Sequence, residues 1–242
     1  MYGAHRRKDT MTEEQRSALA NTKAWLFDLD NTLYSAECRL FDQIHVRMRD
    51  YLMDFFHVGA EEAARIRRKY FLEHGTTLSG LIVNDGIDPA GFLDYVHDID
   101  LSPVKPNPAL DAALARLPGR KLIFTNADTG HARNVMARLG VAHHFEAIFD
   151  IVDADYVPKP DPAVYAQIVA EYGVPAGAAV MLDDMSVNLA PAAAMGMTTV
   201  WVRTHYSWSG DETEDPDHVH HITDDLTAWL EGVAPPAGPD ST

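Results

Sequence analysis

Cysteine is almost absent from this sequence, because its 242 residues include only Cys38. A single cysteine excludes an internal disulfide and any metal site built from several thiolates. Long hydrophobic runs are absent too, since none approaches the roughly 18 residues that a membrane-spanning helix requires. The polar start of the chain lacks the apolar segment of a secretory signal. We therefore expect a cytoplasmic protein with no membrane partner.

Basic residues are scarce relative to acidic ones. The chain has 20 lysines and arginines against 36 aspartates and glutamates, which gives a net charge of −16. A field of that sign repels polyanions, so we expect no nucleic-acid partner. A small phosphorylated substrate remains compatible if a metal ion or fixed hydrogen-bond donors offset the repulsion. The hydrophobic share of 46% is that of a folded globular protein, and the length fits one or two domains.

The two ends of the chain differ in composition from its middle. Residues 1–21 are polar and include a basic run at 5–8, which we interpret as a solvated, disordered tail rather than a nucleic-acid-binding arm. Residues 233–242 are rich in proline and predict a second, frayed tail.

Between the tails, short apolar runs alternate with longer helical patterns. The apolar runs predict buried strands at 24–27, 121–124, 147–151, 178–182 and 198–202. Helical patterns follow at 131–139, 163–172 and 187–194. This alternation predicts an α/β fold, a Rossmann-like parallel sheet with helices on both faces, formed by residues 22–35 and 106–232.

One interval interrupts the alternation. Residues 36–105 contain helical patterns only, at 37–56, 60–74 and 89–97. An insert between the first two strands leaves the sheet at the edge where open parallel sheets bind their ligands. We therefore predict an all-helical cap domain over 36–105 that acts as a lid.

Polar residues stand at the carboxyl end of each predicted strand. Asp28 and Asp30 follow the first strand, Thr125 and Asn126 the second, Lys159 the third, and Asp183 with Asp184 the fourth. In a parallel sheet these ends share one edge, so the carboxylates converge there and repel one another. A hard divalent cation with oxygen ligands relieves that repulsion, and Mg²⁺ fits.

Each of these motifs also has a simpler structural explanation when taken alone. An Asp-x-Asp sequence is common in an acidic chain, Thr125-Asn126 is an ordinary strand-to-loop transition, and Asp161 before Pro162 begins a helix. Their shared placement after separate strands favours a common site.

Taken together, the motifs resemble those of the haloacid dehalogenase-like hydrolases, over about residues 22–231. They are Asp28-Leu29-Asp30-Asn31-Thr32-Leu33, Thr125-Asn126, Lys159 and Asp183-Asp184-x-x-x-Asn188. The helical insert is similar to the small cap that this family places after its first motif. Within the family, the chain looks most like the pyrimidine 5′-nucleotidases, through Phe124-Thr125-Asn126-Ala127-Asp128-x-x-His131-Ala132 and Tyr70-x-x-x-x-Gly75-Thr76-Thr77-x-x-Gly80-Leu81.

The resemblance assigns roles at the end of the first strand. Asp28 is expected to be the nucleophile and a metal ligand, and to form an aspartyl-phosphate. Asp30 is expected to be the general acid and then the general base, with its backbone carbonyl on the metal. Thr32 is expected to help orient the Asp30 side chain and to take part in phosphate binding.

The other motifs are expected to hold the phosphoryl group and the metal. Thr125 and the backbone N–H of Asn126 donate to the phosphoryl oxygens, and Lys159 stabilises both these oxygens and Asp28. Asp184 is expected to bind the metal directly, with Asp183 holding metal-bound waters, although the sequence does not separate the two. Asn188 lies one helical turn after Asp184, in a supporting position.

Residues of the insert are candidates for substrate recognition. His74, Thr76 and Thr77 can offer hydrogen bonds to a base or ribose, or they can simply mark a helix that ends at Gly75. Asp128 and His131 are explained about equally well by the subfamily resemblance and by a helix start. The histidines of 217–221 predict a loop entering a short final strand rather than a metal site.

The predicted function is a Mg²⁺-dependent phosphatase acting on a pyrimidine nucleoside 5′-monophosphate such as UMP or CMP. Alternatives are a phosphatase for another small phosphorylated metabolite, a sugar phosphomutase, a dehalogenase, and a catalytically silent phosphate-binding protein. A dehalogenase needs neither the divalent metal nor the Asp183-Asp184 pair, and a silent binder gains nothing from Asp28 with Asp30. The sequence leaves open whether the protein is a monomer or a dimer.

Overall fold

A computed structural model describes residues 11–204 and 216–234 of the chain. Within them, six strands form one sheet in the order β3-β2-β1-β4-β5-β6, and every neighbouring pair is parallel. Their bounds are β1 (Ala24–Phe27), β2 (Arg120–Phe124), β3 (Ala147–Phe149), β4 (Ala179–Asp183), β5 (Thr198–Val202) and β6 (His221–Thr223). The predicted α/β fold with a parallel sheet is confirmed.

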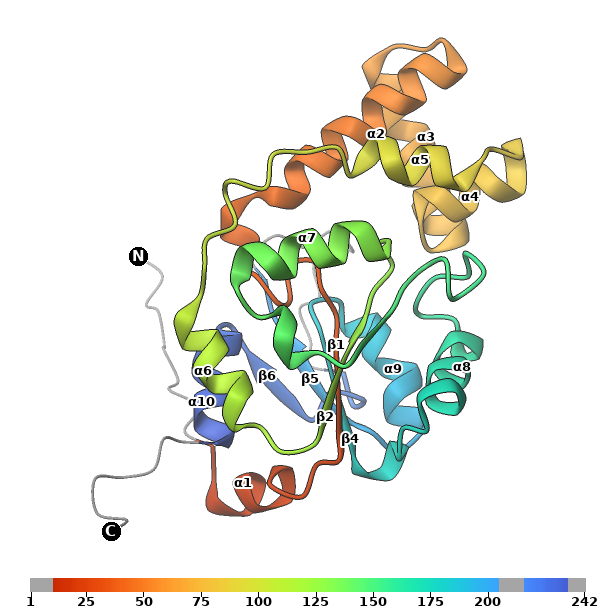
Figure 1. Cartoon of the computed structure of the whole chain (residues 1–242). Coiled ribbons are helices and arrows are strands. Elements are labelled where there is room, and N and C mark those ends of the chain that lie inside the picture. The colour runs from red at the N-terminus through yellow and green to blue at the C-terminus, as the bar shows by residue number, and fades with distance from the viewer. Residues whose placement is uncertain (1–10, 205–215, 235–242) are drawn as a thin grey trace, which may run out of the picture.

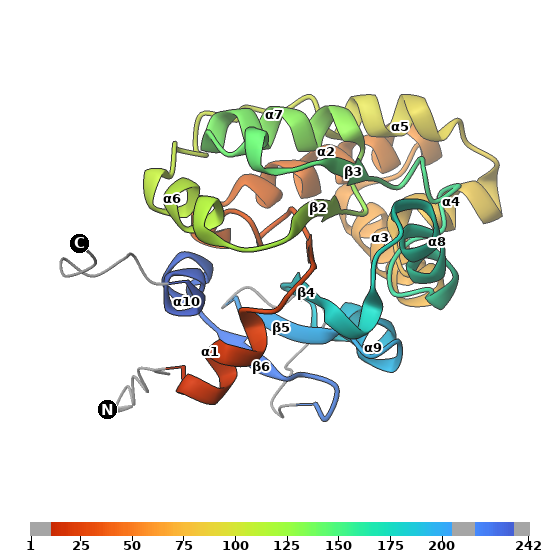
Figure 2. The same ribbon diagram turned by 60° about the horizontal axis from the view of Figure 1, so that its bottom comes forward.

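Helices cover both faces of this sheet (Figures 1 and 2). One face packs against α6 (Pro108–Arg116), α7 (Thr129–Leu139) and α10 (Leu226–Val233), and the other against α8 (Pro162–Tyr172) and α9 (Ser186–Ala194). Alternate residues of β1 divide between the two faces, since Trp25 and Phe27 join the first cluster and Leu26 the second. Burial on both faces explains why the strands are continuous apolar runs.

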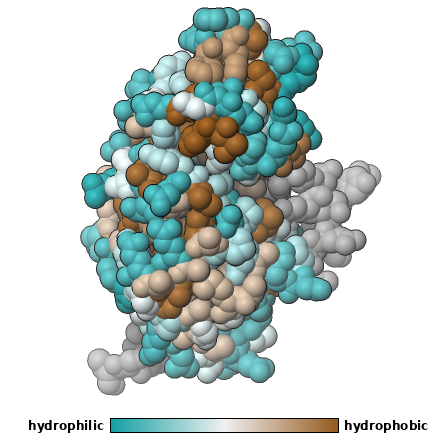
Figure 3. All heavy atoms as spheres, turned by 90° about the vertical axis from the view of Figure 1, so that its right-hand side faces the viewer, coloured by the Kyte–Doolittle hydropathy of each residue, from teal (hydrophilic) through white to brown (hydrophobic). Residues whose placement is uncertain are grey.

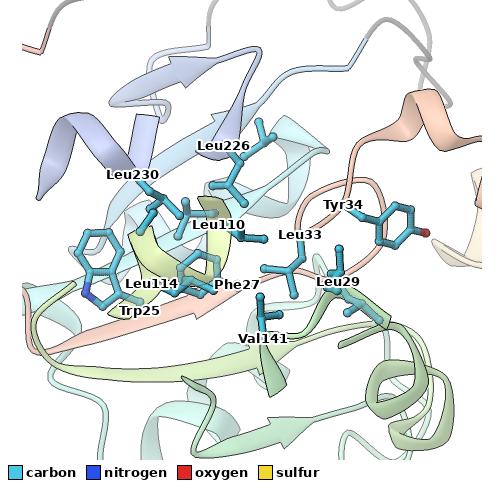
Figure 4. Close-up of a cluster of buried hydrophobic side chains, with 14 of the residues drawn as sticks. Trp25, Phe27, Leu29, Leu33, Tyr34, Leu110, Leu114, Val141, Leu226 and Leu230 are labelled. Carbon is cyan, nitrogen blue, oxygen red and sulfur yellow. The ribbon is translucent and has the colours of Figure 1, made fainter. Parts of the chain in front are cut away.

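The first apolar cluster extends from the sheet into the loop that follows β1. Leu29, Leu33 and Tyr34 join Trp25 and Phe27 in it, as Figure 4 shows. Tyr34 lies at one edge of the cluster, with its hydroxyl directed away from the other labelled side chains. Apolar residues therefore anchor the segment that carries Asp28 and Asp30.

The insert between β1 and β2 is helical, and no strand lies within 36–105. It consists of the short η1 (Ala36–Cys38), α2 (Leu40–Phe56), α3 (Ala60–His74), α4 (Thr77–Asp85) and α5 (Pro89–Val96). These helices have their own apolar cluster and lie above α7 in Figure 1. The helix α4 was not predicted from the sequence, because its apolar residues Leu78 and Leu81 form too short a pattern.

Two further helices correct the predicted organisation. Helix α1 (Glu13–Leu19) falls inside the tail predicted for 1–21; its Thr12 caps it and its Leu19 is buried in the core, so that prediction is wrong for 13–19. Helix α6 was not predicted either. The tail predicted from 233 begins too early, since Val233 is the buried last residue of α10 and Ala234 packs against the core. Residues 1–10 and 235–242 lie outside the described part of the chain.

One face of the molecule carries both apolar and polar side chains. On the face drawn in Figure 3, apolar patches are separated by hydrophilic ones rather than merged into one area. Leu72 of α3 and Val83 of α4 are among the exposed apolar side chains of the insert. Across the described residues, no helix combines the length and the apolar character needed to cross a membrane.

Candidate active site

The end of β1 is built to hold two carboxylates in a fixed turn. The N–H of Asp28 donates to the carbonyl of Leu182 at 2.9 Å, so the pairing of β1 with β4 continues through Asp28. Asn31 has a left-handed backbone with φ of 61°, a conformation that asparagine tolerates better than most residues. Asp28 is therefore fixed by the sheet, and Asp30 projects from the turn beyond it.

Lys159 lies at the centre of the buried charges. Its Nζ donates to Asp28 Oδ1 at 2.9 Å, to Asp183 Oδ2 at 2.7 Å and to the carbonyl of Phe124 at 2.8 Å. Three acceptors use all three ammonium protons. Burial opposes the charge on Lys159, but Asp183 and Asp28 outweigh it and raise the pKa of the ammonium group. Lys159 is thus a permanent cation that joins the ends of β1 and β4.

The loop after β2 fixes the segment that carries Lys159. Asn126 Oδ1 accepts from the N–H of Lys159 at 2.8 Å, and Asn126 Nδ2 donates to the Lys159 carbonyl at 3.3 Å. The hydroxyl of Thr125 accepts from the N–H of Ala127 at 3.0 Å and keeps its own proton for donation. The side chain of Asn126 is therefore structural, and its backbone N–H and the Thr125 hydroxyl are the groups with the chemistry predicted for phosphoryl binding.

The two aspartates at the end of β4 have different surroundings. Asp183 Oδ1 accepts from the N–H of Met185 and from Asn188 Nδ2, both at 2.9 Å, while its Oδ2 accepts from Lys159. Protein donors therefore occupy both oxygens of Asp183. The Asp184 side chain accepts no hydrogen bond from the described residues, whereas its backbone carbonyl accepts from Trp201 Nε1 at 2.9 Å. Burial together with Asp28 and Asp183 raises the pKa of the Asp184 carboxyl group well above the usual value. Asp184 is the carboxylate with free lone pairs.

The position of Asn188 differs from the prediction. Asp184 precedes α9, which begins at Ser186, so the two residues do not share a helix face. Asn188 instead holds Asp183, the carboxylate that anchors Lys159. A spacing of four residues corresponds to one helical turn only when both residues are in the helix, and Asp184 is not.

The donor set at this edge suits a divalent cation. Carboxylate oxygens of Asp28, Asp183 and Asp184 lie within 4.8 Å of one another, with a single ammonium group between them. Burial, and then repulsion from Asp183, raise the pKa of Asp28 to about 7 despite the opposing effect of Lys159. Excess negative charge with free oxygen ligands is the environment in which Mg²⁺ binds. The residues present therefore fit this ion.

Thr32 supplies a second sign that the site is built for a ligand. Its hydroxyl is buried, and among the described residues it has no hydrogen-bond partner. Buried polar groups in native proteins are nearly always satisfied, so such a hydroxyl is available to a bound molecule or water. No contact between Thr32 and Asp30 supports the predicted orienting role.

Asp30 has two hydrogen-bond donors that sequence reasoning did not assign to it. Its Oδ1 accepts from the hydroxyl of Tyr34 at 2.7 Å and from His131 Nε2 at 2.9 Å. Burial by itself would raise the pKa of Asp30, but His131 and Tyr34 lower it below the usual value. His97, at the end of α5, stacks on His131 and contacts the carboxylate of Asp128. No sequence motif indicated His97 or Tyr34, because only the fold brings them to Asp30.

The three candidate residues of the insert lie close to the segment that carries Lys159 but already have structural roles. Thr76 caps α4 by accepting from the N–H of Ser79 at 3.0 Å, and Thr77 is buried in the first turn of α4. His74 Nε2 lies 3.0 Å from Asn84 Nδ2. A Cβ on Gly75 would lie 3.4 Å from Pro158 Cγ, so this turn packs against the segment before Lys159.

The remaining histidine clusters are not part of this edge. Asp111, His143 and His144 come together where α6 meets η2 (Ala142–His144), and both histidines contact Asp111. In the stretch from 217 to 221, His218 contacts the carbonyl of Ser186, and His220 contacts Thr199. The predicted short final strand is present as β6.

Comparison with known proteins identifies the family. Residues 22–196, more than half of the chain, match the haloacid dehalogenase-like hydrolases. Phosphate metabolism protein 8 of Saccharomyces cerevisiae is 30% identical over 219 residues, which cover 81% of this chain and 66% of the yeast protein. This chain therefore spans slightly less than two thirds of that relative. The protein belongs to the haloacid dehalogenase-like hydrolase family, as its motifs predicted.

One further relative and one solved structure are similar to this chain. Phosphoglycolate phosphatase of Rhodospirillum rubrum is 28% identical over 198 residues, covering 76% of this chain and 81% of that enzyme. The crystal structure of CbbY from Rhodobacter sphaeroides in complex with phosphate has a TM-score of 0.60 and 18% identity, and covers 88% of this chain and 99% of that one. The second likeness shows the fold alone.

Proposed function

We propose that this protein is a Mg²⁺-dependent phosphatase that hydrolyses a pyrimidine nucleoside 5′-monophosphate through an aspartyl-phosphate. The observation that carries the proposal is the contact of Asp28 with Lys159 at 2.9 Å, beside a second carboxylate, Asp184, that has no protein donor. A nucleophilic carboxylate must approach an anionic phosphate, and only fixed positive charge makes this approach favourable. The name of the bacterial relative, a phosphatase for a small phosphate ester, supports the same reaction class.

In the first step, Asp28 attacks phosphorus and the bond to the ester oxygen breaks. His131 and Tyr34 favour ionised Asp30, but the negative charge of a bound phosphate ester opposes them and favours the protonated form that reacts. In that form Asp30 gives its proton to the ester oxygen, so the product leaves as a neutral alcohol.

Lys159 and the Thr125 hydroxyl stabilise the negative charge on the transferring phosphoryl group, together with the backbone N–H of Asn126. In the second step, Asp30 takes a proton from water as the water oxygen attacks phosphorus, and the bond to Asp28 breaks to release phosphate.

Three groups would hold the metal ion: the carboxylates of Asp28 and Asp184 and, by resemblance, the backbone carbonyl of Asp30. When bound, the ion supplies charge stabilisation that lets two anions meet. Asp183 acts differently in this proposal. It fixes Lys159 through Oδ2, and because Oδ2 accepts only this one hydrogen bond from the described residues, its second lone pair could also accept from metal-bound water, as the resemblance implies.

The helical insert is proposed to act as a lid and to select the substrate. Its residues 36–105 lie between β1 and β2 in the chain, and the turn at Gly75 packs against Pro158 and the carbonyl of Lys159. His74, Thr76 and Thr77 remain our candidates for contact with the base or ribose. The nucleotide itself is supported by the subfamily resemblance at 124–132 and 70–81.

A panel of phosphate monoesters tests the proposal. UMP, CMP, a purine nucleotide, phosphoglycolate and a sugar phosphate are assayed for released phosphate, with Mg²⁺ and with EDTA. The proposal expects metal-dependent release, fastest with UMP or CMP. Faster release from a non-nucleotide ester contradicts the proposed nucleotide substrate. Turnover that persists in EDTA contradicts the proposed dependence on Mg²⁺. A sugar phosphate that is isomerised without phosphate release identifies a mutase instead.

A further inference from the structure

The proposed general acid and base, Asp30, is held through one of its two oxygens. Oδ1 accepts from both His131 Nε2, at 2.9 Å, and the Tyr34 hydroxyl, at 2.7 Å. Within the described residues, Oδ2 receives no hydrogen bond. Two donors on one oxygen fix the plane of the carboxyl group and leave the second oxygen for proton transfer. Both protonation states keep this arrangement, since a protonated carboxyl still accepts at its carbonyl oxygen.

Contacts with His97 and Asp128 fix His131 in turn. Its ring stacks on that of His97, with centroids 4.3 Å apart and planes 17° from parallel. His97 Nδ1 contacts the carboxylate of Asp128, and the other oxygen of that carboxylate accepts from the N–H of His131 at 2.9 Å as the N-cap of α7. The His131 side chain is only 1% exposed. Its ring therefore has little freedom to turn away from Asp30.

This arrangement joins three separate parts of the chain. Asp30 follows β1, His131 and Asp128 belong to the start of α7, and His97 ends α5 of the helical insert. Figure 1 shows α7 directly beneath the insert. The same contacts are compatible with a purely structural fastening of the insert to the core, so the two interpretations must be separated by chemistry.

We propose that His131 is a positioning residue that fixes the proton-transferring oxygen of Asp30, with His97 and Asp128 holding the His131 ring in place. The proposal rests on the phosphatase function given above. His131 donates to Oδ1 throughout and does not itself exchange a proton with the substrate. The proton moves between Asp30 Oδ2 and the leaving oxygen in the first step, and from water to Asp30 in the second.

The dependence on the leaving group distinguishes positioning from simple fastening. In an alkyl phosphate such as UMP, the leaving group is an alkoxide unless Asp30 protonates the ester oxygen. The first step therefore requires an oriented Asp30. The leaving group of p-nitrophenyl phosphate departs as a stable phenolate without a proton. Its first step is then insensitive to Asp30, whereas hydrolysis of the aspartyl-phosphate still needs Asp30 as base.

The experiment compares His131→Phe with the wild type, because phenylalanine keeps a flat ring against His97 and removes the donor. For UMP and phosphoglycolate we expect kcat/KM to fall by about 10²-fold, the usual contribution of general acid catalysis. For p-nitrophenyl phosphate kcat/KM should stay within about 3-fold while kcat falls by about 10²-fold. A burst of p-nitrophenolate, one per active site, should then appear as the phosphoenzyme accumulates.

Two further variants keep the test decisive. His131→Gln keeps an amide donor and should recover at least about a tenth of the wild-type kcat/KM on the alkyl esters. His97→Leu leaves the His131 donor but removes the stack, and should give the same leaving-group pattern to a smaller extent. His143→Phe, at a histidine whose side chain is 65% exposed, controls for the substitution itself.

Equal losses on alkyl and aryl esters, with no burst, would mean that His131 only fastens the insert and would overturn the inference. Unchanged kinetics in a folded His131→Phe protein would overturn it as well. If the wild-type protein hydrolyses none of the three esters, the proposed function itself is refuted. That outcome is distinguishable from failure of the His131 inference, because it is seen in the wild type without any variant.

Discussion

Replacing Asp184 by asparagine removes one negative charge from the catalytic edge while keeping the size of the side chain. In most buried sites the loss of a charge destabilises the fold, because a partner is left alone. Asp184 is different, since no described residue donates a hydrogen bond to its carboxylate, and its charged neighbours include Asp28 and Asp183. We therefore expect Asp184→Asn to stabilise the metal-free protein.

The size of the effect follows from the geometry. Carboxylate oxygens of the three aspartates lie within 4.8 Å of one another. At that separation and an effective dielectric constant of about 20, two unit charges interact by about 3.5 kcal/mol. Asp28 and Asp183 each repel Asp184, and attraction to Lys159 cancels roughly one of these repulsions. Partial protonation of the aspartates relieves some of the remaining repulsion, so Asp184→Asn should raise the free energy of unfolding by about 1–3 kcal/mol.

The pH of the measurement matters because of Asp28. Burial and Asp183 raise its pKa to about 7 in the folded protein, above its unfolded value of 3.8. Protonation of this group therefore stabilises the folded state at low pH, and that contribution is lost as the pH rises through about 7. The repulsion on Asp184 is fully developed only above that range, so urea unfolding is measured at about pH 8.

Magnesium should reverse the order of stability. Wild-type protein at 1,000 times the dissociation constant for Mg²⁺ gains about 4.1 kcal/mol, which exceeds the advantage expected for the variant in EDTA. Asp184→Asn lacks a proposed ligand and should gain much less, so the wild type becomes the more stable protein. Asp94→Asn, at an exposed position on α5, is the matched control and should change neither measurement. If Asp184→Asn is less stable than the wild type in EDTA, or gains as much from Mg²⁺, the reasoning is refuted.

Three further outcomes are expected. Asp28→Asn should lower kcat by at least about 10³-fold, while equilibrium binding of the phosphate ester persists; retained turnover would remove Asp28 as nucleophile. Lys159→Met leaves Asp28 and Asp183 without their shared cation, and urea unfolding should show a loss of about 3–5 kcal/mol. Gly80→Ala places a Cβ 2.4 Å from Tyr70 atoms and should destabilise the helical insert by about 1–3 kcal/mol, seen as faster hydrogen exchange there. Gly232→Ala, with no atom within 4 Å of its Cβ, is the control for that exchange measurement.

The sequence by itself determined the order of strands and helices and the edge at which the polar motifs meet. Both depend on local information. Runs of apolar residues form strands that are buried on both faces, and parallel strands necessarily end at one edge. Asp28, Thr125, Lys159 and Asp183 could therefore be assigned to a common site although more than a hundred residues separate the first from the last. Three short helices, α1, α4 and α6, were missed because a few apolar residues carry too little periodicity.

Tertiary structure decided how hydrogen bonds are shared among these side chains. The sequence could not separate Asp183 from Asp184, which are adjacent and identical. Only the fold gives one of them Lys159 and Asn188 as donors and leaves the other free. It likewise brings Tyr34 and His131 to a single oxygen of Asp30. The direction of a side chain at a shared edge depends on packing between distant elements, and no local pattern in the sequence encodes it.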